Sequence, residues 1–200
     1  MKVRSILFGF AVVTFFSLSA QSTVISTQYG ADDDGALSCP VYTTGTTDEL
    51  YVDGILHWGP GHVLGDITTD TAEDPTITMD NSLDNDTSFA WTAFRVNVQL
   101  NHVFTILTSP YPSVSVPGDW TANITTQPVN IGGGIYQGTI DFTGGTPVAV
   151  GQTLDFIYKI NFSGLTSYSF CQEFVPIPEP SSLGLLAVGA LFVLRRNRRA

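Results

Sequence analysis

Lysine and arginine are scarce through the middle of this 200-residue chain. Six of the eight basic residues lie in the first four or the last six positions, which leaves Arg95 and Lys159 between them. Residues 23–177, called the body below, hold seventeen acids against these two cations, a formal charge of −15. Nucleic acids and anionic lipids are bound largely through lysine and arginine. The body is therefore disfavoured as a nucleic-acid-binding protein.

The common catalytic motifs are also lacking. The chain has no Gly-x-Ser-x-Gly turn for a serine nucleophile and no His-Glu-x-x-His pair for zinc. Its glycine run, 132–134, precedes an extended segment rather than a helix, so it does not suit a phosphate loop. We therefore predict that the protein is not an enzyme. Glycoside hydrolysis needs only two suitably spaced carboxylates, so a secreted hydrolase remains a less favoured alternative.

Helical periodicity is absent as well, since no twelve-residue segment of the body keeps a convincing helical repeat. Apolar and polar residues instead alternate in short runs that are separated by Gly- and Pro-rich breakers. The runs are 94–100, 120–125, 136–142, 153–162 and 168–174, with weaker ones at 50–56, 75–79 and 103–107. This pattern predicts an all-β fold, an antiparallel β-sandwich of the jelly-roll or immunoglobulin-like kind, with an open barrel as the alternative.

The N-terminus has the composition of a secretory signal peptide. A short basic start, Met1 to Arg4, precedes an apolar stretch from Ile6 to Leu18 and then small residues. Cleavage after Ala20 and cleavage after Ser22 both remain open, and we take residues 1–22 as the signal, with a helix in it. The protein is therefore expected to use the secretion machinery and to work outside the cytosol.

The C-terminus has three parts: the motif Pro178, Glu179, Pro180, an apolar stretch over 183–194, and a basic cluster of Arg195, Arg196, Arg198 and Arg199. Twelve residues make a helix of about 18 Å, short of a hydrocarbon core of about 30 Å. The prolines keep the motif extended and accessible. The arginines act as a basic stop that stays in the cytoplasm. A simple membrane anchor and a segment that is held briefly and then cut both fit this arrangement.

These three parts, in this order at the end of the chain, resemble the PEP-CTERM sorting signal of Gram-negative and related bacteria. The matching residues are 178–183, the Gly- and Leu-rich span 184–191, and 195–199. The resemblance implies that an exosortase, a membrane protease, processes the chain at or near Pro-Glu-Pro. Residues 84–98, and 144–148 followed by 151–156, are more loosely similar to strands of many proteins with this signal.

The chain therefore divides into four predicted parts. Residues 1–22 are the signal peptide, and 23–47 are a flexible acidic segment that is rich in Gly, Thr and Asp. Residues 48–174 form the β-sandwich domain. Residues 175–200 are the sorting signal, with a short transmembrane helix that is inserted transiently in the inner membrane.

Two cysteines, Cys39 and Cys171, flank most of the body. In an oxidising compartment they could pair and tie the start of the domain to its last strand. Two independent buried thiols are the alternative, and the sequence leaves both open.

Cofactor-binding motifs are weak, so we expect no cofactor, with Ca²⁺ as the one candidate. Asp80, Asp84 and Asp86 could form an irregular calcium loop, although the glycine and distal glutamate of the regular motif are missing. His57 and His62 flank a Gly-Pro-Gly turn, but zinc sites need three or four ligands, so we expect solvated histidines.

Trp58, Trp91 and Trp120 are candidates for a sugar-stacking platform, although Trp91 and Trp120 lie in strands that favour core positions. Two targeting ends around an acidic β domain predict a protein of the cell-envelope surface or extracellular matrix. We expect a structural or adhesive component that associates with exopolysaccharide. A carbohydrate-binding module is the alternative, and it would carry a strip of exposed aromatic residues.

Overall fold

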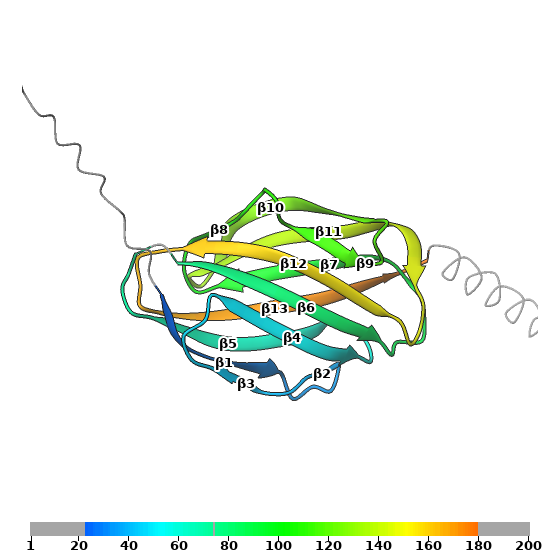
Figure 1. Cartoon of the computed structure of the whole chain (residues 1–200), viewed down its shortest axis with the longest axis horizontal. Helices are drawn as coiled ribbons and strands as arrows, with labels where there is room; N and C mark the ends of the chain where they lie inside the picture. Colours follow the sequence, from blue (N-terminus) through cyan, green and yellow to red (C-terminus); the bar gives the residue numbers. More distant parts are fainter. Residues whose placement is uncertain (1–22, 74, 180–200) are drawn as a thin grey trace, which may run out of the picture.

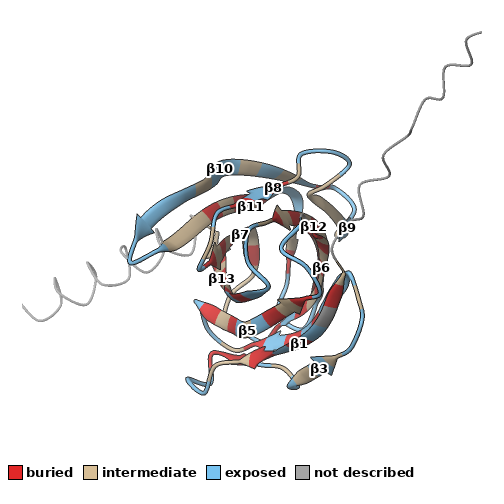
Figure 2. Cartoon of the chain, turned by 90° about the vertical axis from the view of Figure 1, so that its left-hand side faces the viewer, coloured by how far each residue is buried: buried red, intermediate tan, exposed pale blue. Residues whose placement is uncertain are grey.

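The computed structural model describes residues 23–73 and 75–179. The regular secondary structure of these residues consists of β-strands alone. The predicted signal helix and the predicted C-terminal helix lie outside the described residues. The strands form two sheets that face one another (Figures 1 and 2). A search of the described residues for a long apolar helix able to cross a membrane finds none. The prediction of an all-β fold is confirmed.

The larger sheet has seven strands, and all of its pairings are antiparallel. Its order is β10 (Trp120–Gly132), β11 (Ile135–Val148), β7 (Trp91–Leu100), β13 (Ser167–Pro178), β5 (Gly61–Thr69), β1 (Val24–Ala31) and β3 (Tyr42–Thr44). The last strand of the described chain, β13, therefore lies in the middle of this sheet.

The second sheet has the order β2 (Leu37–Ser38), β4 (Glu49–Leu56), β6 (Thr76–Asn85), β12 (Thr153–Phe162) and β8 (Phe104–Ile106), and β9 (Ser113–Val116) also pairs with β12. One pairing departs from the antiparallel prediction, because β4 and β6 run parallel. Between them the chain crosses to the larger sheet as β5 and returns, which brings β6 back in the direction of β4.

The core lies between the two sheets, and buried residues alternate with more exposed ones along strands such as β12. Figure 2 shows the buried residues in red on strands of both sheets. On β12 the inward residues are Leu154, Phe156, Tyr158, Ile160 and Phe162, all buried. The ring of Phe156 contacts three phenylalanines of the facing sheet, with centroid distances of 4.6 Å to Phe142, 5.8 Å to Phe94 and 6.2 Å to Phe174. These contacts join the sheets directly, as a sandwich requires.

The segment over residues 23–47 is not the flexible acidic segment that its composition predicted. It supplies β1, β2 and β3, and β1 pairs with both β3 and β5. Thr27 and Tyr29 are buried on β1, and the Tyr29 hydroxyl donates to the Tyr51 carbonyl oxygen at 2.8 Å. Tyr29 also stacks on Tyr42, with centroids 5.0 Å apart. Because polar residues fill inward positions here, the apolar alternation that marks other strands is missing.

Strand β5 was also missed by the sequence pattern. Two of its inner-facing positions are taken by Gly61 and Gly65 rather than by apolar side chains. At Gly65 a Cβ atom would lie 2.4 Å from the Cβ of Tyr29, so no larger residue fits beside β1. The close approach of two strands therefore replaces side-chain packing at this point.

Two asparagines on the inner face of β6 differ sharply in their hydrogen bonding. Asn85 is fully buried, and its amide nitrogen donates to the carbonyl oxygens of Phe89 (3.0 Å) and Val148 (2.9 Å). Its Oδ1 accepts from the backbone N–H and the hydroxyl of Thr87. Asn81 is equally buried, but neither of its amide groups has a hydrogen-bond partner among the described residues. Asn81 should therefore cost the fold free energy, whereas Asn85 stabilises it.

We expect opposite effects when each asparagine is replaced by leucine. Asn81→Leu should raise the free energy of unfolding by about 1 kcal/mol, because it removes a buried polar group without a protein partner. Asn85→Leu should lower it by about 3 kcal/mol, because several buried backbone groups lose their partner. Chemical denaturation of the two variants checks this, and an equal loss in both would contradict it.

Candidate functional site

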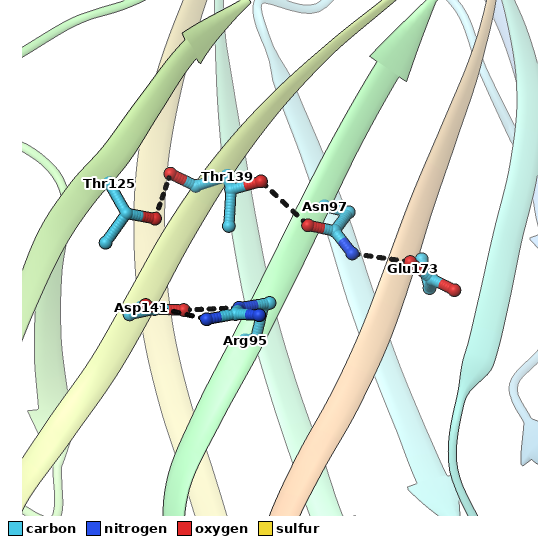
Figure 3. Close-up of polar contacts among 6 residues, drawn as sticks. All are labelled: Arg95, Asn97, Thr125, Thr139, Asp141 and Glu173. Carbon is cyan, nitrogen blue, oxygen red and sulfur yellow. Dashed lines mark hydrogen bonds and ion pairs between the residues drawn. The ribbon is translucent and has the colours of Figure 1, made fainter. Parts of the chain in front are cut away.

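A row of polar side chains crosses four strands on the outer face of the seven-stranded sheet (Figure 3). The Thr125 hydroxyl donates to the Thr139 carbonyl oxygen at 3.3 Å, and Thr139 Oγ1 donates to Asn97 Oδ1 at 2.8 Å. Asn97 Nδ2 then donates to Glu173 Oε2 at 2.5 Å. These residues, called the polar row below, come from β10, β11, β7 and β13, so the row links four neighbouring strands of the sheet.

The polar row continues into a cluster of titratable groups on β5 and after β1. His62 Nε2 lies 3.6 Å from Glu173 Oε1, and His62 Nδ1 lies 3.0 Å from Asp32 Oδ2. Asp34 completes the cluster, since ligand atoms of Asp32, Asp34 and His62 all lie within 4.8 Å of one another. Burial raises the pKa of Asp32, and the neighbouring Asp34 carboxylate raises it further.

Two carboxylates and an imidazole match the ligand types that borderline divalent metals accept. Each group nevertheless has a structural partner. Asp34 Oδ1 accepts the Ala36 N–H at 2.7 Å and closes the turn between β1 and β2, while His62 bridges Asp32 and Glu173. These interactions link β13, β5 and the turn after β1, although Asp32 Oδ1 is buried without a hydrogen-bond partner among the described residues.

Both basic residues of the described chain are engaged. Arg95 donates through Nε and Nη2 to the two carboxylate oxygens of Asp141, at 2.7 and 3.1 Å (Figure 3). The Lys159 ammonium lies 4.8 Å from the centroid of the Tyr111 ring. The acidic surface therefore meets little opposing charge from its own domain.

The candidate calcium ligands Asp80, Asp84 and Asp86 are spread along and beyond a strand. Asp80 and Asp84 lie on β6, and a strand advances about 3.4 Å per residue, so four steps separate them by about 13 Å. Asp84 accepts the Thr153 hydroxyl at 2.6 Å, and Asp86 pairs with His57 Nδ1 at 2.7 Å. A strand in place of the expected loop keeps the three carboxylates from converging.

The two histidines at the Gly-Pro-Gly turn have separate partners. His57 contacts Asp86 and Ser38, whereas His62 contacts Asp32 and Glu173. They are therefore not the solvated side chains that the sequence suggested, and they do not share a ligand-binding point.

The predicted platform of three tryptophans is not formed either. Trp91 and Trp120 are buried, and their indole N–H groups donate to Thr87 Oγ1 and to the Thr146 carbonyl oxygen. Trp58 alone of the three is exposed, at 54%. The core reading of Trp91 and Trp120 is therefore correct.

Cys39 and Cys171 are both free cysteines, so the candidate disulfide is absent from the structure. Cys171 lies on β13, whereas the Cys39 thiol hydrogen-bonds to the backbone of Ala31 on β1. Strand β5 lies between those two strands, and a disulfide needs Cα atoms within about 7 Å. Burial raises the pKa of Cys171 to about 11, with Glu173 and Asp32 adding to the effect.

The C-terminal end of β13 corrects a further expectation. The sandwich was predicted to end at residue 174, with the sorting signal from residue 175, but β13 continues to Pro178. Beyond Phe174 the strand pairs with β7 alone, because its pairing with β5 stops there. Pro176 and Pro178 are tolerated, since a proline does least harm where one side of a strand lacks a partner. The folded body therefore runs directly into the sorting motif.

Comparison with known protein families identifies the PEP-CTERM protein-sorting motif at residues 176–199. The described residues are thus all-β, and residues 176–199 carry a C-terminal sorting motif of the PEP-CTERM kind. This motif supports an exported protein that is sorted at the membrane by an exosortase. No curated protein matches the chain, and no solved structure does.

Asp80 gives a test of the electrostatics on β6. Burial raises its pKa, and the nearby charges of Glu49 and Asp155 raise it further. Its ionised form is therefore disfavoured in the fold, and stability is lost as pH rises through the folded pKa. Asp80→Asn should be more stable than the parent at pH 7, by about 0.5 kcal/mol for a partly exposed group. The difference should vanish below about pH 3, where the carboxyl is protonated in both states.

Asp119→Asn is the matched variant, and we expect it to change stability in the opposite direction to Asp80→Asn. Hydrogen bonds from the Thr146 backbone N–H and hydroxyl lower the pKa of Asp119. Its contribution to stability is present above the ordinary carboxyl pKa and is lost as pH falls through the folded value. Thermal unfolding from pH 3 to 7 should thus show that, at neutral pH, Asp119→Asn is less stable than the parent protein and Asp80→Asn is more stable. A change of stability in the same direction for both variants would contradict the two pKa shifts.

Proposed function

We propose that the protein is delivered to the cell-envelope surface or the extracellular matrix, where it acts as a non-enzymatic structural or adhesive component near exopolysaccharide. The observation that carries the proposal is the sorting motif at residues 176–199, directly after a folded acidic β domain. No cofactor is part of this role. The secretion machinery and an exosortase are its partners during export.

The hairpin between β10 and β11 supports an adhesive role. Its end protrudes from the sandwich, and its β10 side is exposed (Figure 2). Val129 and Ile131 are 52% and 54% exposed there. No charged residue occurs from Trp120 to Gln137, although the body as a whole is strongly acidic. Two copies of such a domain would meet little charge repulsion at this hairpin.

The carbohydrate-binding alternative has less support, because a sugar-stacking surface normally uses several exposed aromatic rings. Trp58 is exposed, but Trp91 and Trp120 belong to the core. Association with exopolysaccharide therefore rests on the destination of the protein, as a property of its surroundings rather than of a binding groove.

The sorting proposal predicts the fate of the full chain in a bacterium that contains an exosortase. Cells should yield a mature protein that has lost Arg195–Arg199 and is recovered from the envelope or the medium. A strain without the exosortase should retain the tail and keep the protein at the membrane. Cell fractionation with mass spectrometry measures both outcomes, and a full-length soluble chain inside the cell, with Arg199 attached, would contradict the proposal.

The adhesive proposal predicts that Ile131→Asp weakens self-association of the mature protein, because it puts a negative charge on the uncharged hairpin. Val150→Asp is the control, since Val150 is also 54% exposed but lies at the other end of β11. Light scattering over a concentration series should show at least a threefold weaker association for Ile131→Asp alone. Equal behaviour of the two variants would remove the hairpin from the proposal.

A further inference from the structure

Acidic side chains gather around His62 on the outer face of the seven-stranded sheet. His62 Nδ1 lies 3.0 Å from Asp32 Oδ2, and ligand atoms of Asp32, Asp34 and His62 all lie within 4.8 Å of one another. On the other side of the ring, His62 Nε2 lies 3.6 Å from Glu173 Oε1. The turn after β1, strand β5 and strand β13 supply these residues, so the fold brings them together from three places in the chain.

The cluster carries more negative charge than the side chains of the described residues balance. Even a protonated His62 would supply one positive charge against the carboxylates of Asp32, Asp34 and Glu173. Both basic side chains of the described residues are engaged elsewhere. Burial and the nearby Asp34 raise the pKa of Asp32, which shows that its ionised form is disfavoured. A bound cation would favour the ionised form of both aspartates.

One oxygen of the cluster lacks a partner. Asp32 Oδ1 is buried and has no hydrogen-bond donor among the described residues. An unsatisfied buried carboxylate oxygen costs free energy, and buried charges are therefore usually paired or bound to a metal. The Asp32 side chain as a whole is 24% exposed, and an open pocket of about 530 Å³ adjoins it. A cation thus has a route to this carboxylate from solvent.

The distances suit a small cation with short bonds. In a tetrahedral site with metal–ligand bonds of about 2.0–2.1 Å, neighbouring ligand atoms lie about 3.3 Å apart. The 3.0 Å between His62 Nδ1 and Asp32 Oδ2 is close to that spacing, and a cation would replace the hydrogen bond between them. Asp34 Oδ1 accepts the Ala36 N–H at 2.7 Å, which fixes the second carboxylate in the turn.

Glu173 lies where the orienting partner of a metal-bound histidine is normally found. A histidine that binds a metal through one ring nitrogen commonly donates its other N–H to a carboxylate, which fixes the orientation of the ring. Here His62 Nε2 faces Glu173, while Nδ1 faces Asp32. Glu173 in turn accepts a hydrogen bond from Asn97, at the end of the polar row (Figure 3). The polar row therefore holds the carboxylate that orients the imidazole.

We propose that Asp32, Asp34 and His62 bind one divalent cation of the Zn²⁺ type, and that Glu173 is the positioning residue for the imidazole. One nitrogen among carboxylate oxygens suits zinc better than Ca²⁺, which takes six to eight oxygen ligands. The fourth position of a tetrahedral site is left to water or to the unpartnered oxygen of Asp32. The ion is structural, because it ties the turn after β1 to β5 and, through Glu173, to β13. This inference goes beyond the proposed function and does not depend on it.

Metal titration of the exported protein, purified in the form that cells yield and stripped with EDTA, tests the site. Isothermal titration calorimetry should show one Zn²⁺ bound per chain, with Ca²⁺ and Mg²⁺ at least about tenfold weaker. Zn²⁺ should also raise the unfolding temperature, because an ion that binds only the folded state stabilises it. The absence of Zn²⁺ binding, or an equal affinity for Ca²⁺, would overturn the proposal.

Substitutions of the cluster locate the bound ion. Asp34→Asn and His62→Gln each remove one ligand and should weaken Zn²⁺ binding more than about 100-fold, beyond the loss expected for an outer hydrogen-bond partner. Glu173→Gln should weaken it by about tenfold. His57→Gln is the matched control, because His57 pairs with Asp86 outside the cluster, and it should bind Zn²⁺ like the parent. Equal affinities of His62→Gln and His57→Gln would place the ion elsewhere and overturn the proposal.

Cobalt gives a test that needs only the parent protein to be folded. Co²⁺ with oxygen and nitrogen ligands shows visible d–d bands, whereas a thiolate ligand adds a sulfur-to-metal charge-transfer band. The parent should show d–d bands alone. In Glu173→Gln these bands should shift, which a mere loss of fold stability would not cause. A charge-transfer band would place the metal on Cys39 or Cys171, the two free cysteines, and would overturn the proposal.

Discussion

The pairing of β13 with β7 on one side and β5 on the other is the constraint on which this fold depends. Without that strand the seven-stranded sheet would divide into β10–β11–β7 and β5–β1–β3. From Phe170 to Phe174 the strand is paired on both sides. Its inward residue Gln172 also accepts the Tyr158 hydroxyl at 2.6 Å, which ties it to the facing sheet. The last strand of the described residues thus unites the two halves of the sheet.

The strands that could be predicted from the sequence are those whose inward positions hold large apolar side chains. On β12 the alternation is strict, and the strand was located to its ends, whereas on β7 it is strict only from Phe94 and the strand begins three residues before the predicted run. Strand β5 gave no such signal, because glycines at its inner positions make sense only beside Tyr29. The end of β13 was predicted four residues too early, since a sequence does not reveal that the strand continues beside β7 after its pairing with β5 stops at Phe174.

The sorting motif could be predicted from the sequence, whereas the polar row could not. The sorting motif is contiguous, so its residues can be recognised without a fold. The polar row joins residues that are distant in sequence, and the contact of Asp32 with His62 spans thirty positions. Acids that are close in sequence, such as Asp80 and Asp84, were separated by the strand that carries them. The positions of the carboxylates on neighbouring strands, and not their spacing in the sequence, decide which of them lie close together.

The central place of β13 also governs when the body can mature. Strands β7 and β5 lie beside it, and each lacks its second neighbour until residues 167–178 have emerged on the far side of the membrane. Pairings between segments so distant along the chain form slowly. The domain must therefore travel in an unfinished state, and its sheet closes only when translocation has reached the boundary of the sorting motif.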